Sequence, residues 1–95
     1  MTSKERAGLR KHANGLETIY QVGKNEIDDA LVKGVGEALK VRELIKLRVQ
    51  DNAVYSAKEA AAILAEKLGA AVIQVIGSKF VLYKRNRDTN KYGVK

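Results

Sequence analysis

The chain has 95 residues, 45% of them hydrophobic, which suits one globular domain with a modest core and leaves no room for a second. It contains no cysteine and a single histidine, so disulfides and thiolate metal sites are excluded and only carboxylate clusters remain as metal candidates. Lysine and arginine number 18 against 11 aspartates and glutamates, and the formal net charge of +7 favours a polyanionic partner.

The first predicted helix begins after Thr2, which forms a capping box with Glu5, and ends at about residues 14–15. Its narrow apolar stripe consists of Leu9, Ala13 and Leu16. Its remaining surface carries the cations Lys4, Arg10 and Lys11. These cations fit a contact with a sugar-phosphate surface, and a solvated basic face explains them equally well.

A predicted strand over residues 19–22 leads into a turn at residues 23–26 and then into a helix. This arrangement is typical of a phosphate-binding turn: Gly23 has backbone freedom, Lys24 supplies a mobile cation, and the helix start offers unpaired N–H groups. Turn geometry and capping alone produce the same residues in many proteins without a ligand. The net positive charge favours the phosphate-binding interpretation.

The second helix is predicted to begin near Asn25 or Glu26 and to continue to about Lys40, with apolar residues spaced by threes and fours. Gly34 and Gly36 lie inside it, at a cost of about 1 kcal/mol each relative to alanine. We therefore expect a neighbouring element to pack closely against this helix.

The second strand is predicted from strict alternation between apolar and basic residues over residues 45–49. Its buried face would hold Ile45, Leu47 and Val49. Its other face presents the cations Lys46 and Arg48. The strand therefore predicts a sheet with one polar face.

The third helix opens with a second capping box, Ser56 with Glu59, and ends at Gly69. Two strands follow, at about residues 71–76 and 79–84, joined by a two-residue loop suited to a type II′ hairpin. From residue 85 the sequence is basic and polar, which predicts a loose C-terminal tail.

The element order α-β-α-β-α-β-β predicts a two-layer α/β sandwich with a four-stranded mixed sheet and helices mainly on one face. The first three strands should be parallel and the last antiparallel. The opposite sheet face would then carry Gln21, Lys46, Arg48 and Gln74. Such a face can touch nucleic acid, although a solvated face is more common, and it lacks the stacked aromatics of an RNA-recognition motif.

Several separated segments resemble, in the same order, the YhbY family. They are residues 2–6 with 9–11, 21–25, 37–39 with 42–46, and 74–77 with 81–83. Members of that family are stand-alone CRM (chloroplast RNA splicing and ribosome maturation) domains, whose fold resembles the C-terminal domain of a bacterial translation initiation factor. The resemblance implies an RNA-binding domain over residues 1–84 that associates with precursors of the large ribosomal subunit, followed by a basic flexible tail at residues 85–95.

The resemblance also implies a GxxG loop, analogous to the KH-domain loop that clamps a nucleic-acid backbone. It falls on Gly23, Lys24, Asn25 and Glu26, so a glutamate stands where the family has its second glycine. A carboxylate there would repel a docked phosphate and restrict the backbone. We therefore expect a grip that is weaker or shifted towards Gly23 and Lys24.

The residues give little support for catalysis. His12 has no distinctive Ser or Asp partner, and Asp28 and Asp29 suit the first turn of a helix. A hydrolase or nuclease should show a carboxylate cluster or a second histidine, and the sequence shows neither. We predict a cytoplasmic RNA-binding protein without enzymatic activity, cofactor, metal, membrane or small-molecule substrate, whose partner is ribosomal RNA or the pre-ribosomal large subunit. The alternatives are a protein–protein adaptor and a general nucleic-acid-binding module without a ribosomal role.

Overall fold

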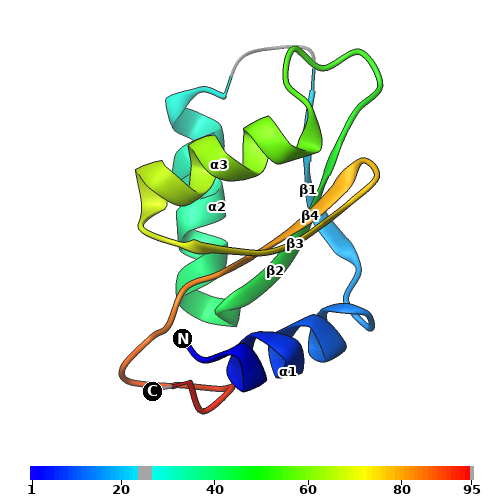
Figure 1. The fold of residues 1–95 in the computed structure, drawn as a ribbon. Helices are drawn as coiled ribbons and strands as arrows, with labels where there is room; N and C mark the ends of the chain where they lie inside the picture. The colour runs from blue at the N-terminus through cyan, green and yellow to red at the C-terminus, as the bar shows by residue number, and fades with distance from the viewer. Residues whose placement is uncertain (24–26, 95) are drawn as a thin grey trace.

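The computed structural model describes residues 1–23 and 27–94. Its elements follow the predicted order, and the predicted α/β sandwich with a four-stranded mixed sheet is confirmed (Figure 1). The elements are α1 (Ser3–Ala13), β1 (Thr18–Val22), α2 (Asp29–Arg42), β2 (Leu44–Val49), α3 (Ala57–Leu68), β3 (Ala71–Ile76) and β4 (Lys79–Tyr83).

The sheet has the strand order β1-β2-β4-β3. β1 and β2 pair in parallel, whereas β4 pairs antiparallel with both β2 and β3. The first three strands therefore share one direction and β4 opposes them, as predicted. A parallel pair needs a crossover connection, which α2 provides between β1 and β2.

The larger core lies between the sheet and helices α2 and α3. Successive side chains of a strand point to opposite faces, so Ile45, Leu47 and Val49 of β2 all face these two helices and are at most 5% exposed. Phe80 and Leu82 of β4 join the same core. The alternation predicted for β2 therefore buries the predicted face.

α1 packs against the opposite face of the sheet. Its side chains contribute to a second buried cluster made of Leu9, Ala13, Leu44, Ile73, Val81, Tyr83 and Val94. Two of the three helices thus share a face, as expected, and α1 is the exception. The reason is the alternation in β2 and β4, because Leu44 and Val81 are apolar on the face opposite the larger core and need their own cover.

Both predicted capping boxes form. The Glu5 N–H donates to Thr2 Oγ1 at 3.1 Å and the Thr2 N–H donates to Glu5 Oε1 at 2.9 Å. Ser56 and Glu59 exchange the same two bonds, at 3.1 and 3.0 Å, at the start of α3. Each box satisfies two N–H groups that a helix start leaves without an intrahelical partner.

α2 begins later than predicted. Its N-cap is Asp28, whose carboxylate accepts a hydrogen bond from the Leu31 N–H at 2.8 Å. Aspartate is a strong N-cap because it satisfies a terminal N–H and places negative charge at the positive end of the helix. The predicted start at Asn25 or Glu26 lies outside the described residues.

Two glycines allow α2 to approach its neighbours closely. A Cβ atom at Gly34 would lie 2.8 Å from the hydroxyl oxygen of Tyr20, on β1. A Cβ atom at Gly36 would lie 3.1 Å from Cδ2 of Leu68, on α3. The close packing expected from the sequence is therefore confirmed, on two different neighbours.

Gly77 and Ser78 form the predicted two-residue loop between β3 and β4. Gly77 has a φ of 58°, whereas Ser78 has no positive φ. A positive φ at the first central residue alone is the pattern of a type II′ turn.

Residues 85–94 differ from the loose tail that the sequence led us to expect. Val94 is only 4% exposed in the cluster beneath α1, and Tyr92 packs beside it. The buried carboxylate of Glu43 accepts three hydrogen bonds from the segment. The segment is ordered by these few anchors, although its composition is polar.

Candidate nucleic-acid interface

The predicted phosphate-binding turn starts where β1 ends. Gly23 is half-buried there, while Lys24, Asn25 and Glu26 lie outside the described residues. Gln50, which follows β2, braces this end of β1. Its N–H donates to the last carbonyl of β1 at 2.9 Å, and its Oε1 would lie 3.0 Å from a Cβ atom at Gly23. A side chain at Gly23 would therefore displace Gln50.

The start of α2 presents acidic side chains on the other side of this turn. Asp28 caps the helix, and Asp29 occupies its first turn. The N–H of Leu31 already donates to the Asp28 carboxylate. An anion approaching the described start of α2 therefore meets two carboxylates.

A row of exposed side chains crosses all four strands on the sheet face shared with α1. The strand register places Gln21, Arg48, Lys79 and Ile76 next to one another in this row. All four side chains are exposed, and Ile76 has 64% of its surface accessible. The sequence predicted Gln21 and Arg48 on this face. Lys79 was missed, although pairing the predicted hairpin with β2 would have placed it opposite Arg48.

A second row lies between this one and α1. Lys46 and Gln74 flank Val81 in it, and both are half-buried. With Asn14 at the end of α1, they line a hollow of about 230 Å³. We use the name open sheet surface for the polar and exposed members of the two rows, namely Gln21, Lys46, Arg48, Gln74, Ile76 and Lys79.

The predicted cations belong to α1, which packs on the same sheet face as the open sheet surface. Lys4, Arg10 and Lys11 are all exposed. The C-cap of α1, Asn14, lines the same hollow as Lys46, so the helix borders that surface directly. The structure thus brings the helix cations and the sheet cations to one side of the sheet, while α2 and α3 cover the other side.

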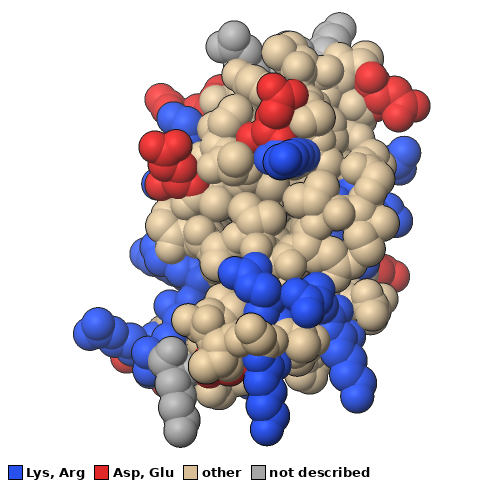
Figure 2. All heavy atoms as spheres, viewed as in Figure 1, with Lys and Arg blue, Asp and Glu red and all other residues tan. Residues whose placement is uncertain are grey.

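Charge is distributed unevenly over the molecule. Figure 2 shows that lysine and arginine gather over the lower part, where α1 and the residues after β4 lie in Figure 1. Aspartate and glutamate lie mostly over the upper part in the same view. This uneven distribution would direct a polyanion towards the α1 end of the molecule.

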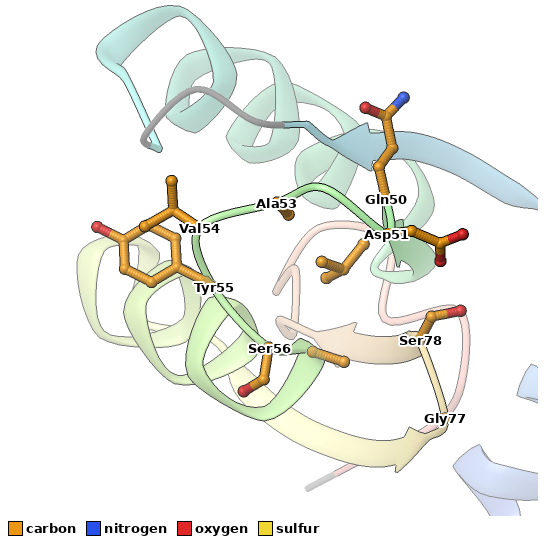
Figure 3. Close-up of a pocket in the computed structure, with 10 residues that line it drawn as sticks. Gln50, Asp51, Ala53, Val54, Tyr55, Ser56, Gly77 and Ser78 are labelled. Carbon is orange, nitrogen blue, oxygen red and sulfur yellow. The ribbon is translucent and has the colours of Figure 1, made fainter.

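A hollow of about 400 Å³ lies between the loop after β2 and the β3–β4 turn (Figure 3). Val54 and Tyr55 project on one side of this loop, and Asp51 and Ser78 lie on the other. Among the described residues, Asp51 is the only charged one that lines the hollow. The described lining of this hollow, with one carboxylate and no cation, does not suit a phosphate.

The described residues offer no further site for catalysis or metal binding. His12 is exposed, and its ring centroid lies 5.2 Å from that of Tyr92 in an edge-on contact. Residues 1–23 and 27–94 contain no group of three or more His, Cys, Asp or Glu placed to hold a metal ion. Within the same residues, no helix is long and apolar enough to cross a membrane.

Comparisons with known proteins show the family of the chain. Residues 1–84 match the model of the CRS1 / YhbY (CRM) domain. The probable RNA-binding protein YqeI of Bacillus subtilis is 35% identical over 91 residues, covering 96% of this chain and 95% of the relative. The probable RNA-binding protein MJ0652 of Methanocaldococcus jannaschii is 36% identical over 94 residues, covering 97% of this chain and 69% of the relative.

A solved structure shows the same fold. The solution structure of the hypothetical protein SAV1595 from Staphylococcus aureus has a TM-score of 0.76 and 36% sequence identity, covering 92% of this chain and 91% of that one. The family model, the two relatives and this structure all extend over most of the chain. The chain therefore belongs to the CRS1 / YhbY (CRM) domain family.

Proposed function

We propose that this protein binds RNA, and that it assists ribosome assembly in the cytoplasm by associating with precursors of large-subunit ribosomal RNA. Two relatives that match nearly the whole chain carry names as probable RNA-binding proteins, which supports the first part. The resemblance to the YhbY family supports the ribosomal part. The formal net charge of +7 suits a polyanionic ligand.

The observation that carries the proposal is that α1, with its exposed cations, packs on the same sheet face as the open sheet surface. Arg48 and Lys79 lie side by side on neighbouring strands, and Lys46 lies one row nearer to α1. Cations spread over a helix and a sheet contact phosphates at several points, which fixes how a structured RNA lies on the protein. None of the six residues of the open sheet surface is aromatic, so this surface favours backbone and shape over base stacking.

This function is binding without chemistry. The predicted turn at residues 23–26 would add a phosphate contact through Lys24 at the far end of β1. The proposal needs no cofactor, since phosphate groups are neutralised by the side chains themselves.

The experiment that tests the ribosomal assignment is crosslinking of the protein to RNA in cells, followed by sequencing of the bound RNA. We expect enrichment of large-subunit ribosomal RNA that still carries precursor sequences. Crosslinks spread evenly over cellular RNA would indicate a general nucleic-acid-binding module. An absence of crosslinks, with proteins captured instead, would indicate the adaptor.

A further inference from the structure

The C-terminal segment, residues 85–94, is fastened to the end of α2 by one buried side chain. Glu43 follows α2 directly and has 0% of its surface exposed. Its Oε2 accepts hydrogen bonds from Thr89 Oγ1 at 2.6 Å and from the Lys91 N–H at 2.9 Å, and its Oε1 accepts one from the Asn86 N–H at 3.3 Å. The first half of the segment is therefore held in a defined position against α2.

This anchoring creates a basic hollow of about 440 Å³ between the end of α2 and the segment. Four cations line it, namely Lys40, Lys84, Arg85 and Arg87. Among the described residues that line it, Asp88 is the only acidic one. All four cations are exposed, so they are free to turn towards a ligand. We call this site the C-terminal basic hollow.

The end of a helix normally repels anions, because its last carbonyl groups carry partial negative charge. At this end, two of those carbonyl groups are already occupied. The carbonyl of Leu39 accepts from the Glu43 N–H at 2.8 Å, and the carbonyl of Lys40 accepts from Asn86 Nδ2 at 3.0 Å. The segment thus covers the Lys40 carbonyl through Asn86 and adds Arg85 and Arg87 at the same place.

We infer that the C-terminal basic hollow is a phosphate-binding site for the RNA backbone, separate from the open sheet surface. This inference rests on the proposed RNA binding. It extends the binding surface to a hollow completed by Arg85 and Arg87, which lie outside the part of the chain that matches the family model. The ligand chemistry follows from four cations around a hollow whose described lining contains one apolar side chain, Leu39, an arrangement that suits phosphodiester oxygens.

The test compares two double variants that remove equal charge. Lys40→Gln with Lys84→Gln removes two cations of the hollow, and Lys58→Gln with Lys67→Gln removes two exposed cations of α3. Lys40 and Lys67 are well matched, because each lies in the last turn of its helix. RNA affinity is measured by titration with a fragment of large-subunit ribosomal RNA at about 0.1 M salt.

We expect the hollow variant to bind about 25-fold more weakly than the unmodified protein, from about fivefold for each lost phosphate contact at this salt concentration. The α3 variant should bind within about twofold of the unmodified protein, because its cations lie on helix surface away from the hollow. Equal losses in the two double variants would overturn the inference, since only total charge would then matter.

A second variant tests the geometry without changing charge. Thr89→Val removes one donor to Glu43 and should loosen the segment, so RNA affinity should fall while the net charge and the salt dependence per contact stay the same. Circular dichroism melting curves for each variant show whether the domain stays folded. Unchanged affinity in both Thr89→Val and the hollow variant would overturn the inference while leaving RNA binding intact. If the unmodified protein did not bind RNA, the proposed function itself would fall.

Discussion

At the scale of single residues, Glu43 is the only buried charged side chain in the part of the chain that the structure describes. Its φ of 64° costs a non-glycine residue about 1–2 kcal/mol. Its hydrogen bonds to the C-terminal segment offset this cost. Burial raises the pKa of the Glu43 carboxyl, but the bonds from Thr89, Lys91 and Asn86 and the charge of Lys91 lower it by more, so the pKa lies below its ordinary value of 4.5.

Glu43→Gln should therefore lower the free energy of unfolding by about 1–3 kcal/mol at neutral pH. The amide has an NH2 group in place of the second carboxylate oxygen, and an NH2 group cannot accept the hydrogen bonds that this oxygen accepted. The folded pKa lies below the unfolded value, so the ionised group stabilises the fold above pH 4.5 and this contribution is lost as the pH falls through the folded pKa. Urea unfolding at about pH 7 and about pH 3 checks this, and the difference between the two proteins should shrink at the lower pH. A difference of equal size at both pH values would contradict it, and Glu66→Gln on the exposed side of α3 is the control.

Two glycines within helices should respond in opposite ways to alanine. A Cβ at Gly8 of α1 would meet no atom within 4 Å, so Gly8→Ala should raise the free energy of unfolding by about 1 kcal/mol through helix propensity. Gly34→Ala gains the same propensity, but its Cβ would lie 2.8 Å from the Tyr20 hydroxyl and 3.3 Å from the ring carbon that carries it. We expect a net loss of about 1 kcal/mol there. Melting curves measure both, and a stabilised Gly34→Ala would show that Tyr20 moves freely.

The turn after β1 gives a prediction that rests on the sequence alone. Lys24→Ala should weaken RNA binding about fivefold at 0.1 M salt and leave the melting temperature unchanged. Glu26→Gly should strengthen binding, because it removes a carboxylate and restores the family's second loop glycine. Lys33→Ala on α2 serves as the control in the same titration. If Lys24→Ala bound RNA as tightly as the unmodified protein and Glu26→Gly bound no more tightly, the turn would not be the binding surface. Binding would then be assigned to α1, the sheet or the C-terminal basic hollow.

At the scale of elements, local signals in the sequence predicted helix starts well where they were unambiguous. The capping boxes at Thr2 and Ser56 placed α1 and α3 correctly. The start of α2 was placed too early, because several residues before it can cap a helix and only the structure shows that Asp28 does. The apolar stripe of α1 indicated a buried face but not which side of the sheet it covers. That choice depends on the apolar residues Leu44 and Val81, which belong to distant strands.

The sequence likewise predicted one part of the candidate interface and not the other. Alternation within β2 placed Lys46 and Arg48 on the correct face, because a strand fixes the direction of its own side chains. The C-terminal basic hollow could not be predicted, since it depends on contacts between residues more than 40 positions apart, such as Glu43 with Thr89. Nothing in the sequence around Glu43 distinguishes it from an exposed glutamate. The polar composition of residues 85–94 therefore predicted a loose segment, whereas one long-range anchor, Glu43, holds it in place.

Ser56→Ala tests how much the capping box at the start of α3 contributes to stability. The variant loses the bond between the Glu59 N–H and the serine hydroxyl, which should cost about 1 kcal/mol, or about 4–8 °C in melting temperature. Ser78→Ala is the matched control, because Ser78 is exposed in a turn and its side chain makes no hydrogen bond to the residues described. Equal melting temperatures for the two variants would show that α3 is fixed by packing alone.

At the scale of the whole molecule, the two faces of the sheet differ in how fully they are covered. α2 and α3 bury the larger core on one side of the sheet, while the other side is only partly covered by α1 and the C-terminal segment. The cations of α1 and the open sheet surface lie on this partly covered side, and the C-terminal basic hollow lies at the end of α2. Figure 2 shows the corresponding concentration of positive charge towards the α1 end. A structured RNA that spans these sites would be held at several points of its backbone.

The most direct test of this account is the salt dependence of RNA affinity in the unmodified protein. A fragment of large-subunit ribosomal RNA is titrated at several concentrations between about 50 and 200 mM salt, and the logarithm of the association constant is plotted against the logarithm of the salt concentration. We predict a straight line with a slope of about −0.7 for each phosphate contacted on single-stranded segments, so about −3 for four such contacts. A slope near zero would contradict the account, because an interface that binds phosphate through lysine and arginine must release counterions when it forms.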